Sequence, residues 1–384
     1  MSNRLLVDQT SRYQRVALLD RHHQLQGLWV QPVPMPTLNA GAIVQAKPHQ
    51  ENTAQGTTIL SAPGLGELQI KSRELSGATT PIMIQVTANA CRSPHPGVPA
   101  KRARASSTLS WASRYMVYMP LAKRRVQHSK RAQHHDVAAV ETLLAPFDGH
   151  WIIRARAQEV SLVQLGQTAQ ALYDRAQAVL SPSQSQSQPL SGSSSATDDD
   201  ATTETGALVQ AGVTALEAAL IEMPPAPSLV EIFAEDDEAE AACHAALGHL
   251  GLAGCITQQA GLFEGLDVVQ AVEALRLPVV TGAGFRLVIE PTEALTAIDV
   301  DLADQGRLDA ALIACWHQIR LRHLSGMIMI DIPRQVDWSA VKKRLHGLTA
   351  DHAEPVTVTM LPGPGMVSLS IPRRRPMLHE VLID

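Results

Sequence analysis

The stretch "IEPTEALTAIDVD", residues 289–301, ends an apolar run with two carboxylates, Asp299 and Asp301. A second apolar run, "GMIMIDIP" at residues 326–333, ends in the same way with Asp331. Both runs are typical of buried strands, and "RLDAALIACWHQIRLRHL", residues 307–324, between them has the periodicity of a helix. A strand–helix–strand unit makes its two strands parallel, so both carboxyl ends emerge at one edge of the sheet. We therefore expect Asp299 and Asp331 to face one another.

Two neighbouring carboxylates repel unless a positive charge lies between them. Mg²⁺ is commonly held by one or two protein carboxylates, with water and phosphate oxygens completing its shell. The alternative is that each aspartate only caps a turn or a helix. That alternative suits a single acid, whereas three acids on paired strands favour a metal site.

The bulk composition limits the class of protein. The chain has 384 residues, 45% of them hydrophobic, and this length and apolar content suffice for two or three domains with hydrophobic cores. Its formal net charge is -5. Its four cysteines contain no C-x-x-C pair, so neither a disulfide framework nor a four-thiolate zinc site is indicated. A signal-peptide pattern and a bilayer-length apolar run are both missing, and we expect a reduced, soluble, cytoplasmic protein without a membrane partner.

In one long segment, Lys and Arg occur without any acidic residue. From Leu75 to His135 there is no Asp or Glu, while ten Lys or Arg occur. Such a block predicts a surface for a polyanion. A solvated loop whose acidic partners lie elsewhere in the fold is the alternative.

The remaining segments suggest the order of the parts. Residues 4–30 read as the two strands of a hairpin, and short β-like runs from Pro32 to about Ala88 suit a small barrel. "GHWIIRARA" at residues 149–157 predicts a strand, and "LVQLGQTAQALYDRAQAVL" at residues 162–180 predicts a helix. The polar, low-complexity segment 181–205 predicts a disordered linker.

The motifs "GFRLVIEPTEALTAIDVD" and "QIRLRHLSGMIMIDI" closely resemble the catalytic region of the ribonuclease E/G family. "RLLVDQTSRYQRVALLD", "ASSTLSWASRYMVYMP", "GHWIIRARA" and "GMVSLSIPRRRPML" resemble further segments of that family in the same order. The resemblance implies an α/β multidomain fold. Its expected parts are the hairpin 1–34 of a ribonuclease-H-like part, an inserted OB-type barrel 35–118, an end-sensor-like subdomain 119–180, the linker 181–205, the second ribonuclease-H-like segment 206–281 and a deoxyribonuclease-I-like catalytic part 282–384.

The resemblance also implies roles for single residues. Asp299 and Asp331 match the aspartates that hold Mg²⁺, and Asp301 replaces an asparagine that orients a hydrated metal ligand. Arg154 matches the arginine that reads a 5′-monophosphate, although the adjoining threonine is here Ala155. The expected RNA contacts are Ser129, Lys130, Arg131, Arg154, Arg373 and Arg374.

The chain departs from the family pattern elsewhere. Positions that present stacking aromatics in the family correspond to Ile59 and Leu68, so base stacking is not available there. The chain also ends before the family's paired-cysteine segment, so no zinc-linked tetramer is expected, and monomer and dimer both stay open.

These features predict a Mg²⁺-dependent endoribonuclease that cleaves single-stranded RNA and leaves 5′-phosphate ends. The alternative is a catalytically weak RNA-binding or scaffold protein that retains the family fold. A third possibility, a metal-dependent phosphohydrolase of small nucleotides, would not need the basic block.

Overall fold

The computed structural model describes residues 4–75, 81–91, 97, 99–129, 136–181, 208–223, 231–350 and 352–382. In these residues the chain is a mixed α/β protein with four β-sheets. Lys130 and Arg131 lie outside the described residues, as does the predicted linker apart from Ser181. No helix in the described part of the chain is long and apolar enough to cross a membrane.

The N-terminal segment forms three strands, and the prediction of a two-stranded hairpin is therefore wrong. The second turn, residues 20–24, is closed by Asp20, whose Oδ1 accepts the backbone N–H groups of His22 and Gln24 at 2.8 and 3.0 Å. The strands join a five-stranded sheet in the order β15-β14-β1-β2-β3, with β1 parallel to β14. They are β1 (Arg4–Gln9), β2 (Tyr13–Leu19), β3 (Leu25–Pro32), β14 (Glu231–Ala234) and β15 (Cys255–Gln258).

Helices cover both faces of this first sheet. One face packs on α3 (Ala215–Glu222) and α4 (Asp237–Leu250), and the other on α5 (Leu262–Gly265) and α6 (Val268–Ala274). Helix α3 begins in a capping box, in which Thr214 and Glu217 each bond the other's backbone N–H.

A small barrel follows the first three strands. Its strands close through the pairing of β4 with β7, which gives a closed five-stranded barrel of the OB type, and β13 (Leu208–Gln210) adds to β4 outside the closure. Among the described residues, the buried apolar core of the barrel consists of Ala, Val, Ile and Leu side chains. The barrel strands are β4 (Ile43–Asn52), β5 (Thr57–Ala62), β6 (Gly66–Lys71), β7 (Ile82–Ala88) and β8 (Ala103–Ser106), with the short 3₁₀ turns η1 (Thr53–Gln55) and η2 (Ser72–Glu74) between them.

The third sheet is small and packs on two helices. Its order is β11-β12-β10-β9, and its core is rich in aromatic rings, with Tyr118 stacked on Trp151 at 4.2 Å between ring centroids. The predicted strand and helix of this region are confirmed as β12 and α2. The elements are β9 (Trp111–Ala112), β10 (Met116–Met119), β11 (Arg125–His128), α1 (Val137–Leu144), β12 (His150–Ile153), η3 (Ala155–Glu159) and α2 (Leu162–Leu180).

The C-terminal sheet contains the predicted strand–helix–strand unit. Strand β18 is parallel to β19 and antiparallel to β17, and the helix between β18 and β19 is α7, so this prediction is confirmed. The sheet order is β16-β17-β18-β19-β21-β20. The elements are β16 (Val279–Gly282), β17 (Phe285–Pro291), β18 (Thr296–Leu302), η5 (Gln305–Arg307), α7 (Leu308–Leu321), β19 (Gly326–Asp331), α8 (Trp338–Thr349), β20 (Thr357–Leu361), β21 (Met366–Ile371) and α9 (Leu378–Val381).

Helices cover only one face of this sheet. Along β18, Thr296, Ile298 and Val300 are buried against α7, whereas Asp299 and Asp301 are exposed on the opposite face. Alternation of this kind follows from the two-residue period of a strand. The acids therefore lie on the open face of the sheet.

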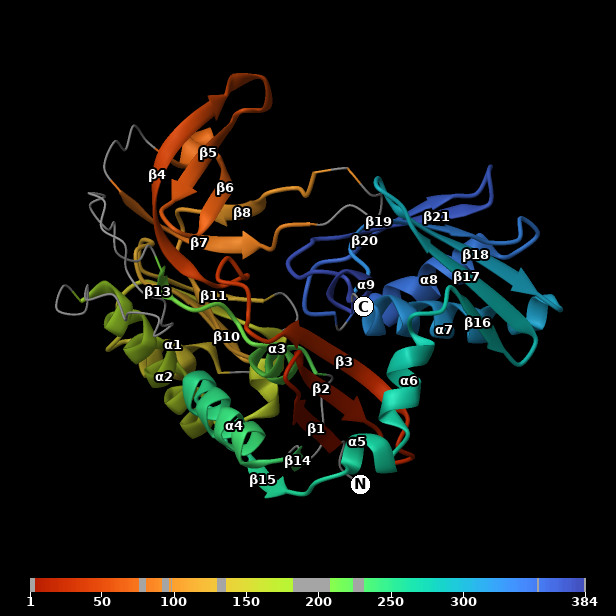
Figure 1. Ribbon diagram of the computed structural model, residues 1–384, viewed down its shortest axis with the longest axis horizontal. Helices are drawn as coiled ribbons and strands as arrows, with labels where there is room; N and C mark the ends of the chain where they lie inside the picture. Colours follow the sequence, from red (N-terminus) through yellow and green to blue (C-terminus); the bar gives the residue numbers. More distant parts are fainter. Residues whose placement is uncertain are drawn as a thin grey trace, which may run out of the picture.

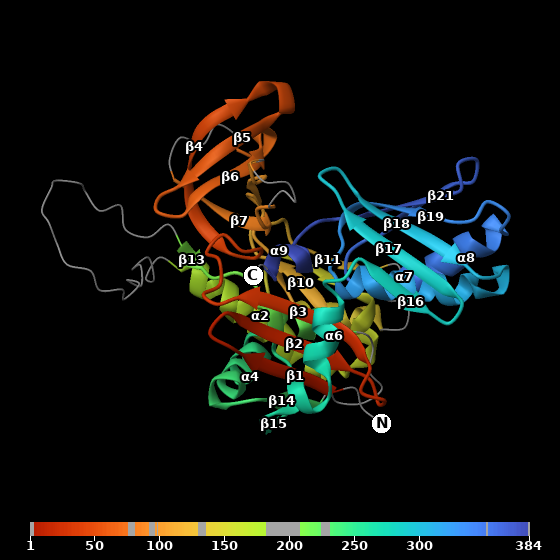
Figure 2. The same cartoon turned by 45° about the vertical axis from the view of Figure 1, so that its right-hand side comes forward.

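The barrel and the C-terminal sheet lie on opposite sides of the molecule, above the first sheet (Figures 1 and 2). Two strands cross the predicted boundaries between parts, since β13 pairs with the barrel and β16 with β17 of the C-terminal sheet. The boundaries themselves stay predictions.

Candidate active site

Asp299 and Asp331 are direct neighbours across the parallel pair β18–β19. The register aligns Asp299 with Asp331, and both side chains are exposed on the open face. Adjacent strands lie about 4.8 Å apart, so the two carboxylates are within the reach of one ion. The structure thus brings together the two aspartates that the sequence predicts to face one another.

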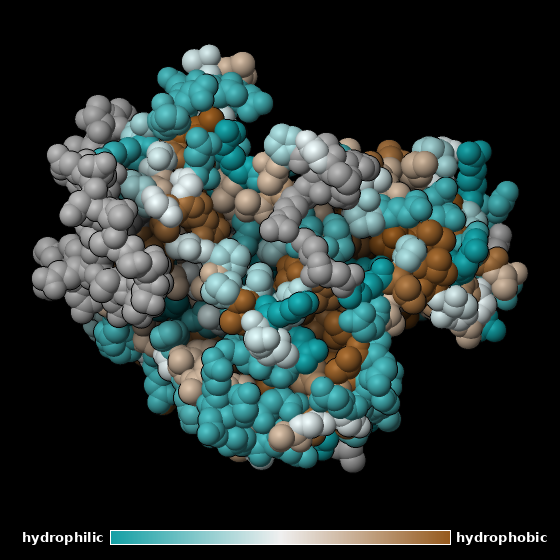
Figure 3. All heavy atoms as spheres, viewed as in Figure 1, coloured by the Kyte–Doolittle hydropathy of each residue, from teal (hydrophilic) through white to brown (hydrophobic). Residues whose placement is uncertain are grey.

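The surface around this pair is partly apolar. Met327, on the same face of β19 as Asp331, is 51% exposed, and Leu361 at the end of β20 is 38% exposed. Figure 3 shows apolar atoms over the region of β17 and β18, bordered by hydrophilic residues. An open face of this kind gives a long substrate free access to the two acids.

Asp301 lies two residues beyond Asp299 on the same strand face. Its Oδ2 accepts from Nε of Arg286 at 2.9 Å and from Nη2 at 2.5 Å. Arg286 is the register partner of Asp301 on β17. The guanidinium therefore balances the charge of the third carboxylate.

The donor set at the sheet edge fits Mg²⁺. Within the described residues, no group of three or more His, Cys, Asp or Glu side chains lies close enough together to hold a metal ion. Two neighbouring carboxylates on an open face do match Mg²⁺, which takes few protein ligands and keeps water or phosphate oxygens. They do not match a structural zinc site, which needs four sulfur or nitrogen ligands.

Arg154 lines a hollow of about 1100 Å³. Its Nη1 donates to the Ser113 carbonyl at 2.8 Å, and burial lowers the pKa of its guanidinium. Ala155 opens the 3₁₀ turn η3 and offers no hydroxyl. Arg374 lines the same hollow, but Asp299 and Asp331 do not.

The two C-terminal arginines have different environments. Arg373 is almost fully buried in an ion pair with Glu380, at 2.5 Å between Nη2 and Oε2. Arg374 pairs with Glu354 at 2.6 Å, but its side chain stays 54% exposed. Of these two predicted RNA contacts, only Arg374 presents its charge to solvent.

The predicted RNA contact of Ser129, Lys130 and Arg131 lies only partly within the described residues. Ser129 is half-buried, and its backbone N–H donates to the Ile153 carbonyl at 2.8 Å. Its predicted partners Lys130 and Arg131 lie outside the described residues.

The barrel positions matched to stacking aromatics do not share one face. Leu68 is 0% exposed inside the barrel core, so its assignment to an RNA-facing position is wrong. Leu60 faces Leu68 across the ladder, whereas Ile59 is half-buried and faces Gln69. A one-residue shift in strand register moves a side chain to the opposite face, which accounts for the error.

Sequence reasoning missed Arg286 and the half-buried pair of Glu222 with Arg375. Arg286 could have been found, because it alternates with the apolar Leu287 on the strand that must pair with β18, and so lies on the same face as the acids. The contact of Glu222 with Arg375 joins residues 153 positions apart and has no local sequence signal.

The described residues thus define a mixed α/β protein with an OB-like barrel and paired acids on an open sheet face. The chain belongs to the ribonuclease E/G family, whose model matches residues 110–375, more than half of the chain. The match includes Asp299, Asp301, Asp331 and Arg154. A search of curated proteins finds no match. Membership of this family implies a ribonuclease whose substrate is RNA.

Proposed function

We propose that the protein is a Mg²⁺-dependent endoribonuclease that cleaves single-stranded RNA and leaves 5′-phosphate ends. The observation that supports this most is the alignment of Asp299 with Asp331 on the open face of the C-terminal sheet. Membership of the ribonuclease E/G family supports the same reading.

Asp299 and Asp331 would hold Mg²⁺ from adjacent strands. The ion would supply a Lewis acid for the phosphoryl oxygens and lower the pKa of a water molecule. Hydrolysis of this kind would form a bond between a water oxygen and phosphorus and break the P–O3′ bond. The upstream fragment would then end in a protonated 3′-hydroxyl, and the phosphate would stay on the 5′ end of the downstream fragment. Buried Ile298 and Val300 hold β18 against α7 and fix the direction of the Asp299 side chain.

Substrate binding would rest mainly on charge and on the accessible sheet face. Arg374 keeps its side chain half exposed, and the basic segment that includes Lys130 and Arg131 adds further attraction for phosphates. The barrel contributes no aromatic platform, because the chain has no Phe, Tyr or Trp between Trp29 and Trp111.

The lack of barrel aromatics favours one alternative, a catalytically weak RNA-binding or scaffold protein of the same family. Loss of base stacking, at about 1–3 kcal/mol per base, would weaken the hold on single strands. That protein would bind RNA through its basic segment without cutting it.

A labelled single-stranded RNA, incubated with the purified chain with and without Mg²⁺, separates these functions. The proposal predicts internal cleavage only with Mg²⁺, and every downstream fragment should be a substrate for a 5′-monophosphate-dependent exonuclease. Binding without cleavage at any Mg²⁺ concentration would favour the scaffold alternative. Fragments with 5′-hydroxyl ends would contradict the proposed chemistry.

A further inference from the structure

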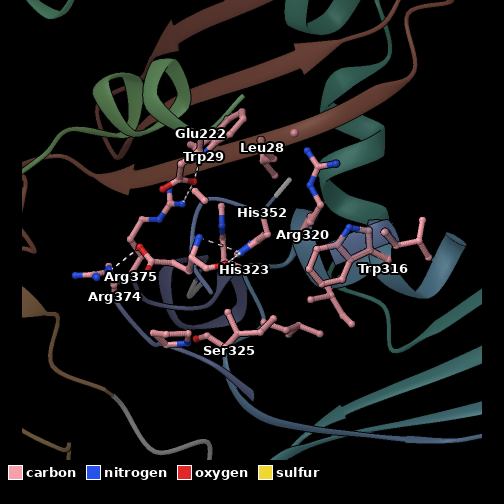
Figure 4. Close-up of a pocket in the computed structure, with 18 of the residues that line it drawn as sticks. Leu28, Trp29, Glu222, Trp316, Arg320, His323, Ser325, His352, Arg374 and Arg375 are labelled. Atoms are coloured by element: carbon pink, nitrogen blue, oxygen red, sulfur yellow. Dashed lines mark hydrogen bonds and ion pairs between the residues drawn. The ribbon is translucent and has the colours of Figure 1, made fainter. Parts of the chain in front are cut away.

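A second cavity, of about 350 Å³, lies where the C-terminal part meets the rest of the chain. Its walls come from β3, η3, the ends of α3, α7 and α8, the turn after α7, the segment before β20, and the end of β21 with the segment after it. Figure 4 shows His323 and His352 near its centre, with Arg374 and Arg375 on one side and Trp316 on the other. Asp299 and Asp331 do not line it, and neither does Arg154.

The lining of this cavity is positively charged. Four arginines and two glutamates line it, which leaves an excess of two positive charges. Two histidines add no charge at neutral pH, because burial lowers the pKa of His323 to about 3 and also lowers that of His352. A cavity of this sign and size selects small anions.

Two of the arginines have carboxylate partners. Arg375 forms an ion pair with Glu222, which also accepts from Trp29 Nε1 at 3.0 Å. Arg374 pairs with Glu354. These pairs hold the cavity wall but leave the excess charge in place.

Arg320 has no such partner. It extends from α7 toward β3, where Nη2 is 3.4 Å from the Gln26 carbonyl (Figure 4). In the part of the chain that the structure describes, no carboxylate lies within ion-pair distance of it. Burial lowers the pKa of its guanidinium. The charge of Glu222 acts on Arg320 in the opposite direction, but that carboxylate is already paired with Arg375 and bonded to Trp29. A half-buried cation without an ion-pair partner of its own favours a bound anion, and a phosphate group is the anion that a guanidinium binds best.

Ser325 supplies a second unused group. It lines the cavity, and its Oγ is shielded from solvent without a hydrogen-bond partner among the described residues. In Figure 4 Ser325 and Arg320 lie on opposite sides of the two histidines. A ligand that satisfies both groups therefore needs a phosphate and, at some distance from it, another polar group.

The cavity wall also contains flat apolar surface. Trp316 lines it and is only 5% exposed, with the edge of its ring against His352 at 5.3 Å between centroids. Buried aromatic walls with a few placed polar groups are the usual lining of sites for small organic ligands. Inorganic phosphate alone would leave this wall and Ser325 unused.

We propose that this cavity is a binding site for a small phosphomonoester of the size of a nucleoside monophosphate. Its phosphate pairs with Arg320, its ring lies against the Trp316 wall, and a hydroxyl of its sugar bonds Ser325. The occupied site ties β3, α7 and the segment after β21 together, so the ligand also stabilises the position of the C-terminal sheet.

Calorimetry on the full chain, without RNA and in phosphate-free buffer, tests the site with three probes. AMP should bind with a Kd below about 1 mM and at least fivefold more tightly than inorganic phosphate, while adenosine should not bind measurably. AMP should also raise the unfolding temperature, because it binds only the folded chain. Equal affinity for AMP and phosphate would contradict the roles given to Trp316 and Ser325.

Variants assign the binding to this cavity. Arg320→Gln should weaken AMP binding at least tenfold, and Ser325→Ala about threefold or more. Arg322→Gln is the matched control. Arg322 is a buried arginine at the end of the same helix, and it does not line the cavity. Its guanidinium donates instead to the Gln318 side chain and the Leu277 carbonyl. It should leave the affinity within twofold.

Two further measurements keep the outcome clear. Without ligand, Arg320→Gln should unfold at a temperature no lower than the unchanged chain, since it removes a half-buried charge that has no ion-pair partner among the described residues. Arg154→Gln should leave AMP binding intact. Absence of AMP binding, an equal loss in Arg322→Gln, or a loss in Arg154→Gln would overturn the proposal. None of these results depends on RNA cleavage, so a failure of this proposal can be distinguished from a failure of the proposed nuclease function.

Discussion

Asp301 is ion-paired with Arg286, its neighbour across the β17–β18 ladder, and lies two residues from Asp299. The resemblance to the ribonuclease E/G family implies an uncharged asparagine at this position. The carboxylate and the guanidinium together carry no net charge, as the asparagine does. The ion pair therefore adds no net charge beside Asp299 and Asp331.

The first prediction is a double-mutant cycle on this pair. A unit charge about 7 Å from a divalent ion changes its binding by roughly 1 kcal/mol at solvent-like dielectric, or about fivefold. Asp301→Asn leaves Arg286 unbalanced and should raise the Mg²⁺ concentration for half-maximal cleavage two- to fivefold, with activity retained. Arg286→Gln should lower it by a similar factor, and the double variant should return to within twofold. Initial cleavage rates against Mg²⁺ measure this, and shifts of equal sign in the two single variants would contradict it.

The second prediction concerns the 5′ end of the RNA. Arg154 keeps its guanidinium, but Ala155 lacks the hydroxyl that would complete a phosphate contact, at a loss of roughly 1.5–3 kcal/mol. Monophosphorylated and hydroxyl-ended copies of one RNA should be cut at rates within several-fold of each other. Ala155→Thr should increase the preference for the monophosphate about tenfold. A strong preference in the unchanged chain that Arg154→Ala removes would show that another donor replaces the threonine.

The third prediction is a pH dependence of stability from His323. The charged or titratable neighbours of this half-buried residue are Arg375, Glu222 and His352, and burial, the largest effect, lowers the folded-state pKa to about 3. This pKa lies below the value of about 6.5 in the unfolded chain. The contribution of neutral His323 to the free energy of unfolding is therefore complete above pH 6.5 and is lost as pH falls from 6.5 toward 3. Each pH unit in this window costs up to about 1.4 kcal/mol.

Urea unfolding at pH 7, 6 and 5, in phosphate-free buffer, measures this slope. His323 has a φ of +52°, which asparagine tolerates, so His323→Asn is the variant of choice. It should show a shallower loss of stability than the unchanged chain. His346→Asn, at an exposed position of α8, is the control and should keep the original slope. Equal slopes in all three proteins would exclude His323 as the source.

The fourth prediction concerns zinc. Burial raises the pKa of Cys243 and Cys315 to about 12, so neither thiol supplies a thiolate ligand at neutral pH. Burial also raises the pKa of Cys91, next to Glu380. We expect no stoichiometric zinc in the purified chain and no change of oligomeric state on zinc chelation. Elemental analysis that finds about one zinc per chain or per pair of chains would sink this expectation.

The sequence was sufficient where the pattern is local. The run from Phe285 to Asp331 shows strand and helix periods in order, and the parallel geometry follows from the crossover, so the neighbouring positions of Asp299 and Asp331 were predictable. The barrel was predictable from its short apolar runs, although the face of Leu68 was not. Its direction depends on the register of β5 with β6, which one residue of slip reverses.

The charge partners were not predictable, because they depend on packing between distant segments. Arg373 reads as an exposed RNA contact within "RRR", yet the short helix α9 brings Glu380 to it and buries both. Glu222 lies in an apolar helix, and only the folded chain places it against Arg375 and Trp29. The proposed phosphomonoester cavity is likewise built from contacts between distant segments, so no single sequence motif predicts it.

Cleavage of one labelled single-stranded RNA by the Asp299→Asn and Asp331→Asn variants tests the central claim most directly. Each change removes one proposed metal ligand, and it should leave the shape of the sheet and the basic surface intact. Each should therefore reduce the cleavage rate at least about a hundredfold while RNA affinity stays within a few-fold. Asp304→Asn, an exposed acid in the turn after β18, should cleave at the original rate. Full activity in either the Asp299 or the Asp331 variant, with RNA binding retained, would contradict the paired-carboxylate site.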